Sequence, residues 1–170
     1  MDHPSGMALN VEEFRIHDAI QDWTLSWHPA VLPVPSGTPW GSAGICLTAD
    51  GEVVLVSSGG ESWGLPGGRP EEDEDWRATL DREVREETCV RVDDATLLGF
   101  SRGVCTRGPE EGWVLVRTLW RAAVSVNPWE PHHETSHRLL APLDEAMARV
   151  DLLREAAAAI SYFLSIEGED

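Results

Sequence analysis

The chain contains no lysine: all 13 of its basic residues are arginines, and they stand against 30 acidic residues. The formal net charge of the 170 residues is therefore −17. Such a charge repels nucleic acid polymers and anionic membrane surfaces, so neither is an expected partner. A phosphate-bearing small molecule would need metal ions or locally placed arginines in order to bind.

The sequence also lacks paired cysteines and long apolar runs. Cys46, Cys89 and Cys105 are widely spaced and form no CxxC motif, which argues against a disulfide scaffold or a zinc ribbon. The first ten residues hold no apolar segment of signal-peptide length, and no apolar run approaches the roughly 20 residues of a membrane span. We therefore expect a soluble, cytoplasmic protein.

The composition divides the chain into three parts. Residues 1–39 are expected to be an N-terminal extension, because four prolines interrupt its end at 28–39. Residues 40–165 form the main domain, and 166–170 form an acidic tail. Apolar residues near the start recur at roughly helical spacing, which predicts a short helix in the extension. These residues are Val11, Phe14, Ala19 and Ile20.

The main domain mixes strand and helix patterns. Two short apolar stretches flank Asp50-Gly51, a turn dipeptide that predicts a β-hairpin. The remaining predicted elements are a helix over 75–88, strands over 96–106 and 112–126, and closing helices over 144–165. Strands combined with helices predict a layered α/β (α+β) domain.

The segment "REVREETCV", residues 82–90, gathers three glutamates at helical spacing. At about 100° per residue, Glu83 and Glu87 lie beneath the apolar stripe and Glu86 lies at its edge, where an idle charge is costly. Arg82 and Arg85 are expected to point elsewhere. Clustered carboxylates suit Mg²⁺ or Mn²⁺, although a purely structural acid cluster remains the alternative. The apolar stripe consists of Trp76, Leu80 and Val84.

At this point the stretch "GRPEEDEDWRATLDREVREETCV" resembles the Nudix box, G-x5-E-x7-R-E-U-x-E-E-x-G-U, where U is a bulky apolar residue. Only Cys89 departs from it, because the family has glycine there. A glycine would end the helix in a left-handed conformation that disfavours other residues, so we expect a different helix ending. The matching positions are Gly68, Glu74, Arg82, Glu83, Val84, Glu86, Glu87 and Val90.

The resemblance implies an α/β/α sandwich with a mixed central sheet. It also implies metal-dependent hydrolysis of a nucleoside diphosphate linked to another group, usually with Mg²⁺ and with Mn²⁺ as the substitute. The ligand would be a small nucleotide or nucleoside diphosphate derivative, and a homodimer is common in the family. By position, the metal ligands would be Glu83, Glu86, Glu87 and the backbone carbonyl of Gly67.

Other roles also follow from the resemblance. Glu74 and Arg82, with Gly68, would fix the loop against the helix, while Glu83 and Glu86 would take part in catalysis through the metal. Many members use a glutamate from a late loop as general base, and Glu134 lies at about that position. The alternatives for the base are Glu130, Glu110 and Glu111.

Substrate-binding residues are less clear from the sequence. Many family members carry phosphate-binding arginines after the second strand, where this chain has Ser57-Ser58. A tryptophan could stack on a base, and Trp63 and Trp129 are the candidates for a pocket wall. The arginines that could replace the missing ones are Arg69, Arg102 and Arg107.

Two other functions compete with this reading. Residues 133–137, "HETSH", match the H-E-x-x-H zinc peptidase motif with His133, Glu134 and His137, but no apolar helical stripe surrounds them. The other alternative is a catalytically silent nucleotide-binding module with the same fold, which the intact box disfavours.

Overall fold

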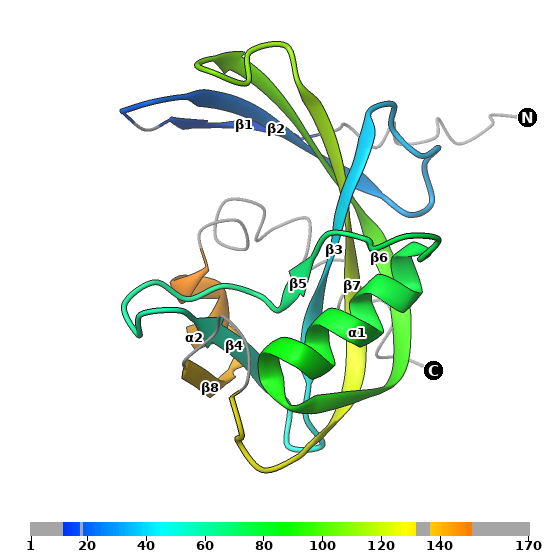
Figure 1. Cartoon of the computed structure of the whole chain (residues 1–170), viewed down its shortest axis with the longest axis vertical. Helices are drawn as coiled ribbons and strands as arrows, with labels where there is room; N and C mark the ends of the chain where they lie inside the picture. Colours follow the sequence, from blue (N-terminus) through cyan, green and yellow to red (C-terminus); the bar gives the residue numbers. More distant parts are fainter. Residues whose placement is uncertain (1–11, 18, 132–136, 151–170) are drawn as a thin grey trace, which may run out of the picture.

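The computed structural model describes residues 12–17, 19–131 and 137–150. Within them, one mixed sheet has the strand order β1-β2-β6-β7-β3-β4-β8, and the short β5 pairs with β3 (Figure 1). The β3–β7 pair is parallel, whereas the other described pairs are antiparallel. The elements are β1 (Glu12–His17), β2 (Asp22–Pro29), β3 (Thr38–Leu47), β4 (Glu52–Ser57), β5 (Gly67–Gly68), α1 (Trp76–Thr88), β6 (Val90–Arg107), β7 (Val114–Val126), β8 (His137–Pro142) and α2 (Leu143–Arg149).

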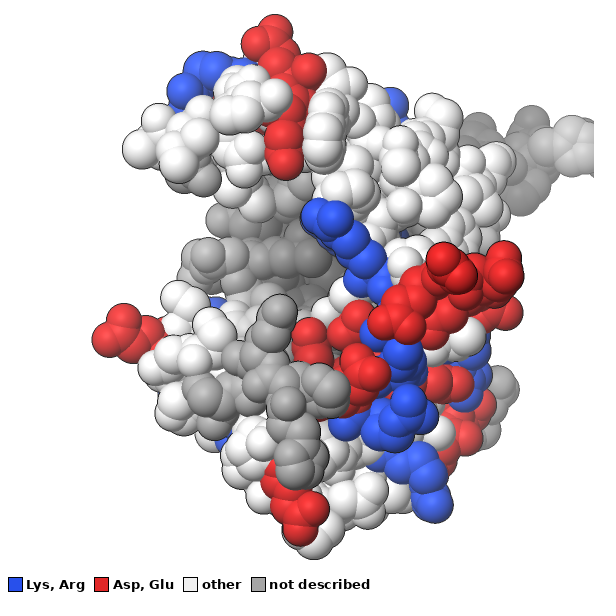
Figure 2. All heavy atoms as spheres, viewed as in Figure 1, with Lys and Arg blue, Asp and Glu red and all other residues white. Residues whose placement is uncertain are grey.

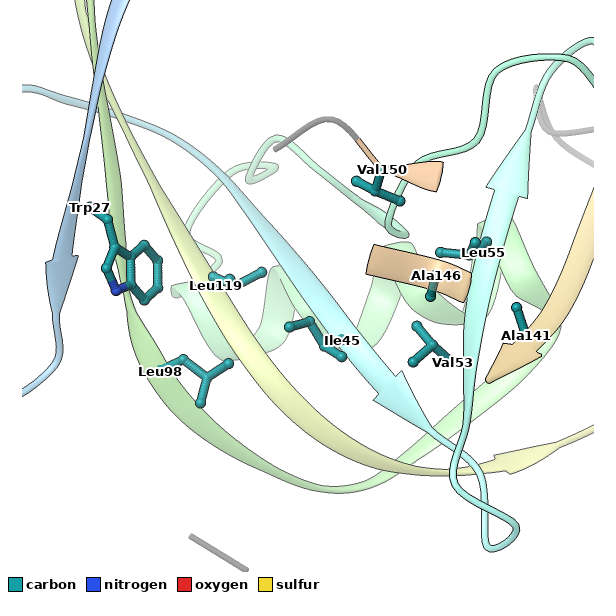
Figure 3. Packing of buried hydrophobic residues seen from close by; sticks show 9 residues of the cluster. All are labelled: Trp27, Ile45, Val53, Leu55, Leu98, Leu119, Ala141, Ala146 and Val150. Atoms are coloured by element: carbon teal, nitrogen blue, oxygen red, sulfur yellow. The ribbon is translucent and has the colours of Figure 1, made fainter. Parts of the chain in front are cut away.

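The two helices cover opposite faces of the sheet. Cys46 of β3 packs in one core with Leu80 and Val84 of α1. Its neighbour Ile45 packs in a second core with Ala146 of α2. Because successive strand residues point to opposite faces, these two cores lie on either side of the sheet, as the α/β/α expectation requires. Figure 3 shows the core on the α2 side.

The strand pattern of the sequence is confirmed in the main domain. Gly51 adopts a φ of 78° in the turn between β3 and β4, and its N–H donates to the Thr48 carbonyl at 2.9 Å. The predicted helix is α1, and the long strands β6 and β7 cover the two later predicted strands. Only the beginning of the closing helical region, α2, lies in the described part; residues 151–170 lie outside it.

The short helix predicted in the extension is wrong. Residues 12–17 and 22–29 are the strands β1 and β2, which add an antiparallel hairpin to the edge of β6 (Figure 1). Leu25 and Trp27 of β2 are buried, and their alternate spacing is that of a strand. Pairing with β6, far away in the sequence, decides the conformation of this segment.

None of the helices in the described residues is long and apolar enough to cross a membrane.

Candidate functional site

Helix α1 begins at Trp76 because the preceding residue caps it. The Asp75 carboxylate accepts a hydrogen bond from the Ala78 N–H at 2.7 Å. Leu80 and Val84 are fully buried under the helix. The apolar side of α1 is therefore fixed on the sheet, and the positions of its glutamates follow from this orientation.

The three box glutamates lie at the border of the buried face. The side chains of Glu83 and Glu86 are 16% and 32% exposed, and Glu87 is also partly buried. Arg85, between them in sequence, is exposed. The helical rotation derived from the sequence therefore placed the glutamates correctly, because none of them points straight into solvent.

Figure 2 shows acidic and basic side chains mixed on the side of the molecule where Figure 1 draws α1. Arg82 is the centre of the ionic network of this helix. Its Nε and Nη2 donate to the two carboxylate oxygens of Glu74 at 2.8 and 2.9 Å, and Nη2 also donates to the Arg69 carbonyl at 2.8 Å. Its Nη1 donates to Glu83 at 2.8 Å and to Glu86 at 3.3 Å. The guanidinium thus joins the loop before α1 to the helix.

Our expectation that Arg82 points away from the glutamates is wrong. The direction of its Cα–Cβ bond does not limit the long side chain, which bends back over the helix surface. The hydrogen bond from Arg82 is the main cause that lowers the pKa of Glu74 to about 2. The same bond is the main cause that raises the pKa of Arg82.

Two glycines bring the loop backbone against the helix. The Gly67 N–H donates to a carboxylate oxygen of Glu87 at 3.1 Å. Gly68 packs so closely on the carboxylate of Glu83 that a Cβ at position 68 would overlap it. Glycine at position 68 therefore permits direct contact between the loop and the Glu83 carboxylate, whereas glycine at position 67 permits close approach to Ser42 and Ala43 of β3.

The carboxylates are held by the protein's own donors. Among residues 12–17, 19–131 and 137–150, no group of three or more His, Cys, Asp or Glu side chains has a metal-binding arrangement. Arg82 draws Glu83 and Glu86 toward itself, and the Gly67 N–H holds Glu87.

The donor chemistry nevertheless fits a hard divalent cation, because carboxylate oxygens are the ligands such ions prefer. The single positive charge of Arg82 is shared among four carboxylates within 3.6 Å, so the group keeps a net negative charge. These four belong to Glu71, Glu74, Glu83 and Glu86.

The candidates for the general base lie in different places. Glu134 falls outside the described residues. Glu130 is exposed, and its backbone carbonyl accepts a contact from the Cys89 thiol at 3.3 Å, beside the end of α1. Glu110 lines a cavity near Arg69, and Glu111 is exposed.

Arg138 of β8 ties the segment that follows residues 132–136 to the end of α1. Its Nη1 donates to the carbonyls of Thr88 and Asn127 at 2.8 and 2.9 Å. No pattern in the sequence indicated this role. Both flanks of residues 132–136 are therefore tied to the C-terminal end of α1.

The candidate substrate residues separate in space. The Arg69 guanidinium lies 3.6 Å from the ring centroid of Trp40. Arg102 donates to the Ser36 carbonyl at 2.8 Å, and Arg107 forms an ion pair with Asp22 at 2.8 Å. Of the three arginines, only Arg69 lies next to the box loop.

The aromatic candidates do not form a common wall with Arg69. Trp63 packs on the core under α2 and contacts the His137 ring edge-on at 6.5 Å. Trp129 lies 5.2 Å from the Arg138 guanidinium. Trp63 is therefore a packing residue in this arrangement.

One tryptophan and one arginine near the site, Trp40 and Arg117, are not indicated by any pattern in the sequence. Trp40 has no partner on β7, because the register shifts between Pro39 and Gly41. Such a bulge redirects a side chain. Arg117, paired in register with Gly41, lines the same cavity as Trp40 and Arg69. The prolines before and at the start of β3 indicate irregular backbone, but they do not predict a bulge that redirects Trp40.

The zinc peptidase alternative conflicts with the fold. His137 is the first residue of strand β8 and pairs with Ser57. A zincin needs both histidines one turn apart on a helix. His133 lies outside the described residues, but the strand at His137 removes the required helix.

The expected change in helix ending is also wrong. Cys89 itself adopts the left-handed conformation, with φ 55° and ψ 39°, at the end of α1. Its N–H donates to the Arg85 carbonyl at 3.1 Å, and its carbonyl accepts from Asn127 at 3.1 Å. The cysteine therefore replaces glycine without changing the helix ending.

A mixed sheet between two helices, with an acidic helix after a glycine loop, defines the fold class. The model of the NUDIX domain family matches residues 38–163. The chain therefore belongs to the NUDIX domain family, a class of pyrophosphohydrolases that act on acid anhydrides and generally use divalent metal ions.

Solved structures share this fold. A point mutant of the pyrophosphohydrolase BsRppH of Bacillus subtilis has 22% identity and a TM-score of 0.70, covering 93% of this chain and 98% of its own. The MutT NUDIX hydrolase of Burkholderia pseudomallei has 24% identity and a TM-score of 0.50, covering 63% and 85%. The NUDIX domain of Shewanella oneidensis NrtR, solved with ADP ribose, has 22% identity and a TM-score of 0.55, covering 73% and 88%. A search among curated proteins found no match.

Proposed function

We propose that the protein hydrolyses a pyrophosphate bond in a nucleoside diphosphate linked to another group, with Mg²⁺ or Mn²⁺ as cofactor. The observation that carries this proposal is the contact of Glu83 and Glu87 with the Gly67–Gly68 backbone, beside Glu86, which shares Arg82 with Glu83. Arg82 holds Glu83 and Glu86, the Gly67 N–H holds Glu87, and this single arginine leaves negative charge for a cation to balance. The ADP ribose bound by the S. oneidensis neighbour supports a nucleotide derivative as ligand.

The residues of the chain have distinct tasks in this proposal. Glu83, Glu86, Glu87 and the Gly67 carbonyl would hold the metal. A bound divalent ion supplies charge neutralisation at the pyrophosphate oxygens and lowers the pKa of an attacking water. Arg82, fixed by Glu74, keeps Glu83 and Glu86 in position before the metal binds.

A general base would take the proton of the attacking water. Glu134 is our candidate, and Glu130 is the alternative. The anchoring of both loop flanks beside α1, through Cys89 and Arg138, supports a base from this loop.

The proposal is tested by replacing one ligand without changing the shape of the side chain. Glu86→Gln should lower kcat/KM by about a hundredfold or more on the best substrate of a nucleotide panel, because metal contacts supply several kcal/mol. Glu72→Gln removes the same charge from an exposed loop position and should retain wild-type activity. Full activity of Glu86→Gln would overturn the metal assignment.

The same assay addresses a silent binding module. Saturable nucleotide binding by the wild-type protein, without turnover in Mg²⁺ or Mn²⁺, would favour that alternative.

A further inference from the structure

Two adjoining cavities form a cleft beside the box loop. The first, about 260 Å³, and the second, about 380 Å³, share Trp40, Arg69 and Arg117. A separate cavity of about 550 Å³ is lined mostly by the opposite face of the hairpin, with Asp22 and Thr24 of β2. The cleft runs from the box loop to Trp23 of the β1–β2 hairpin.

The inner end of the cleft reaches the two glycines that contact the box glutamates. Gly67 and Gly68 line the first cavity. Gly68 packs on the Glu83 carboxylate, and the Gly67 N–H donates to Glu87. A ligand with one end at the glutamates can therefore extend past these glycines into the cleft.

Two arginines stand at the junction of the first and second cavities. Neither the Arg69 nor the Arg117 guanidinium forms an ion pair or hydrogen bond with any residue in the described part of the chain. What distinguishes this pair is that both line the same two cavities. Five other described arginines pair with carboxylates. These are Arg77, Arg82, Arg91, Arg107 and Arg149.

The charges around this junction favour an anion. Arg117 is exposed overall. Desolvation by neighbouring atoms is the main cause that lowers its pKa, the nearby charge of Arg69 lowers it further, and Glu110 opposes this effect. Two like charges are thus held close together in a protein whose net charge is −17. A phosphate between the guanidiniums would relieve their repulsion and accept their hydrogen bonds.

The outer part of the cleft offers an aromatic and apolar wall. Trp23 and Leu25 of β2, Ile16 of β1 and Leu115 of β7 line it, together with the carboxylate of Glu110. A tryptophan face suits stacking with a nucleobase, and a carboxylate can accept hydrogen bonds from amino or hydroxyl groups. This wall fits a nucleoside better than it fits a fully hydrophilic sugar.

We propose that the cleft selects nucleoside triphosphates over nucleotide sugars. The nucleoside lies against Trp23 of the hairpin, the phosphate nearest to it lies at Arg69 and Arg117, and the two outer phosphates lie at the glutamates. This inference rests on the proposed function, which places the cleaved pyrophosphate at the glutamates. A nucleotide sugar has only two phosphates and would leave the arginine pair without one.

The test measures binding without turnover. Calorimetric titration with Mg²⁺ compares adenosine and guanosine triphosphates that carry methylene bridges at both anhydride positions with the matching methylene diphosphates. We expect the wild-type protein to bind one triphosphate at least tenfold more tightly than its diphosphate. Arg117→Gln should weaken triphosphate binding by about tenfold to a hundredfold and remove this preference.

Arg121→Gln is the matched control. Arg121 lies on the same strand but lines a separate cavity with Asp94 and Thr96. It should keep the wild-type preference. Equal binding of triphosphate and diphosphate to the wild-type protein, or equal losses in Arg117→Gln and Arg121→Gln, would overturn the inference.

Two further measurements distinguish a loss of binding from misfolding, and the cleft proposal from the proposed function. Thermal unfolding by circular dichroism verifies that each variant is folded, and Arg69→Gln replaces Arg117→Gln if the latter is not. Hydrolysis of natural nucleotides is assayed in parallel. A triphosphate preference without hydrolysis upholds the cleft and overturns the proposed function, whereas hydrolysis without the preference overturns only the cleft.

Discussion

Among single residues, Arg82 and Glu74 form the contact that joins the box loop to α1. The folded-state pKa of Glu74, about 2, lies below its usual value of 4.5. Ionised Glu74 therefore stabilises the fold fully above about pH 4.5, and this stabilisation disappears as the pH falls toward 2.

Glu74→Gln tests this linkage. The variant should be less stable than the wild-type protein at pH 7, and the difference should shrink as the pH falls from about 4.5 to about 2. Urea unfolding midpoints at stepwise pH measure it, with Glu72→Gln as the exposed control. A difference that stays constant over this range would contradict the ionic role of Glu74.

Cys89 shows that a non-glycine residue can occupy the left-handed position at the end of α1. Its φ of 55° costs an L-residue about 1–2 kcal/mol, which glycine avoids. Glycine, however, has a more flexible unfolded chain, and this entropy cancels part of its advantage. Cys89→Gly should therefore be about 1 kcal/mol more stable than Cys89→Ala, which keeps the strain and also lacks the thiol. We expect a melting temperature about 2–4 °C higher. Equal stability of the two variants would mean that the conformation carries no strain.

Among the elements, α1 determines the geometry of the site, and its first turn depends on one cap. Asp75→Ala should lower the free energy of unfolding by about 1 kcal/mol, because the Ala78 N–H loses its acceptor. Asp75→Ser retains an acceptor and should recover most of this loss. Urea unfolding measures both variants. An equal loss in the serine variant would show that charge, rather than capping, stabilises the turn.

The sequence predicts α1 and its glutamates well because their pattern is local. Leu80 and Val84 define the buried face, and helical rotation then places Glu83 and Glu87 beside it. The sequence predicts a short helix where the structure has the β1–β2 hairpin, because the conformation of β2 depends on pairing with β6, far away in the sequence.

The cleft was missed for the same reason. Trp40 is redirected by a bulge, and Arg117 approaches Arg69 only through the parallel pairing of β3 with β7. Neither the bulge nor the pairing of β3 with β7 produces a periodic pattern in the sequence. The candidate site could thus be predicted where one helix carries it, but not where several strands and a loop assemble it.

For the whole molecule, the net charge of −17 makes binding of a polyphosphate dependent on cations. In the box, several partly buried carboxylates lie close together and share Arg82 as their counter-ion. A cation bound only by the folded state should therefore stabilise the entire domain, even without substrate.

The last prediction follows from this linkage. Mg²⁺ at about a hundred times its dissociation constant stabilises the fold by about 2.7 kcal/mol, which for a chain of this size raises the melting temperature by roughly 5–10 °C. Glu86→Gln should lose most of this rise, whereas Glu72→Gln, with the same change in net charge, should retain it. Differential scanning calorimetry at constant ionic strength measures the shifts. Because general screening of the negative charge would act on both variants alike, an equal rise in the two would mean that Mg²⁺ stabilises the protein through its overall charge rather than through the box.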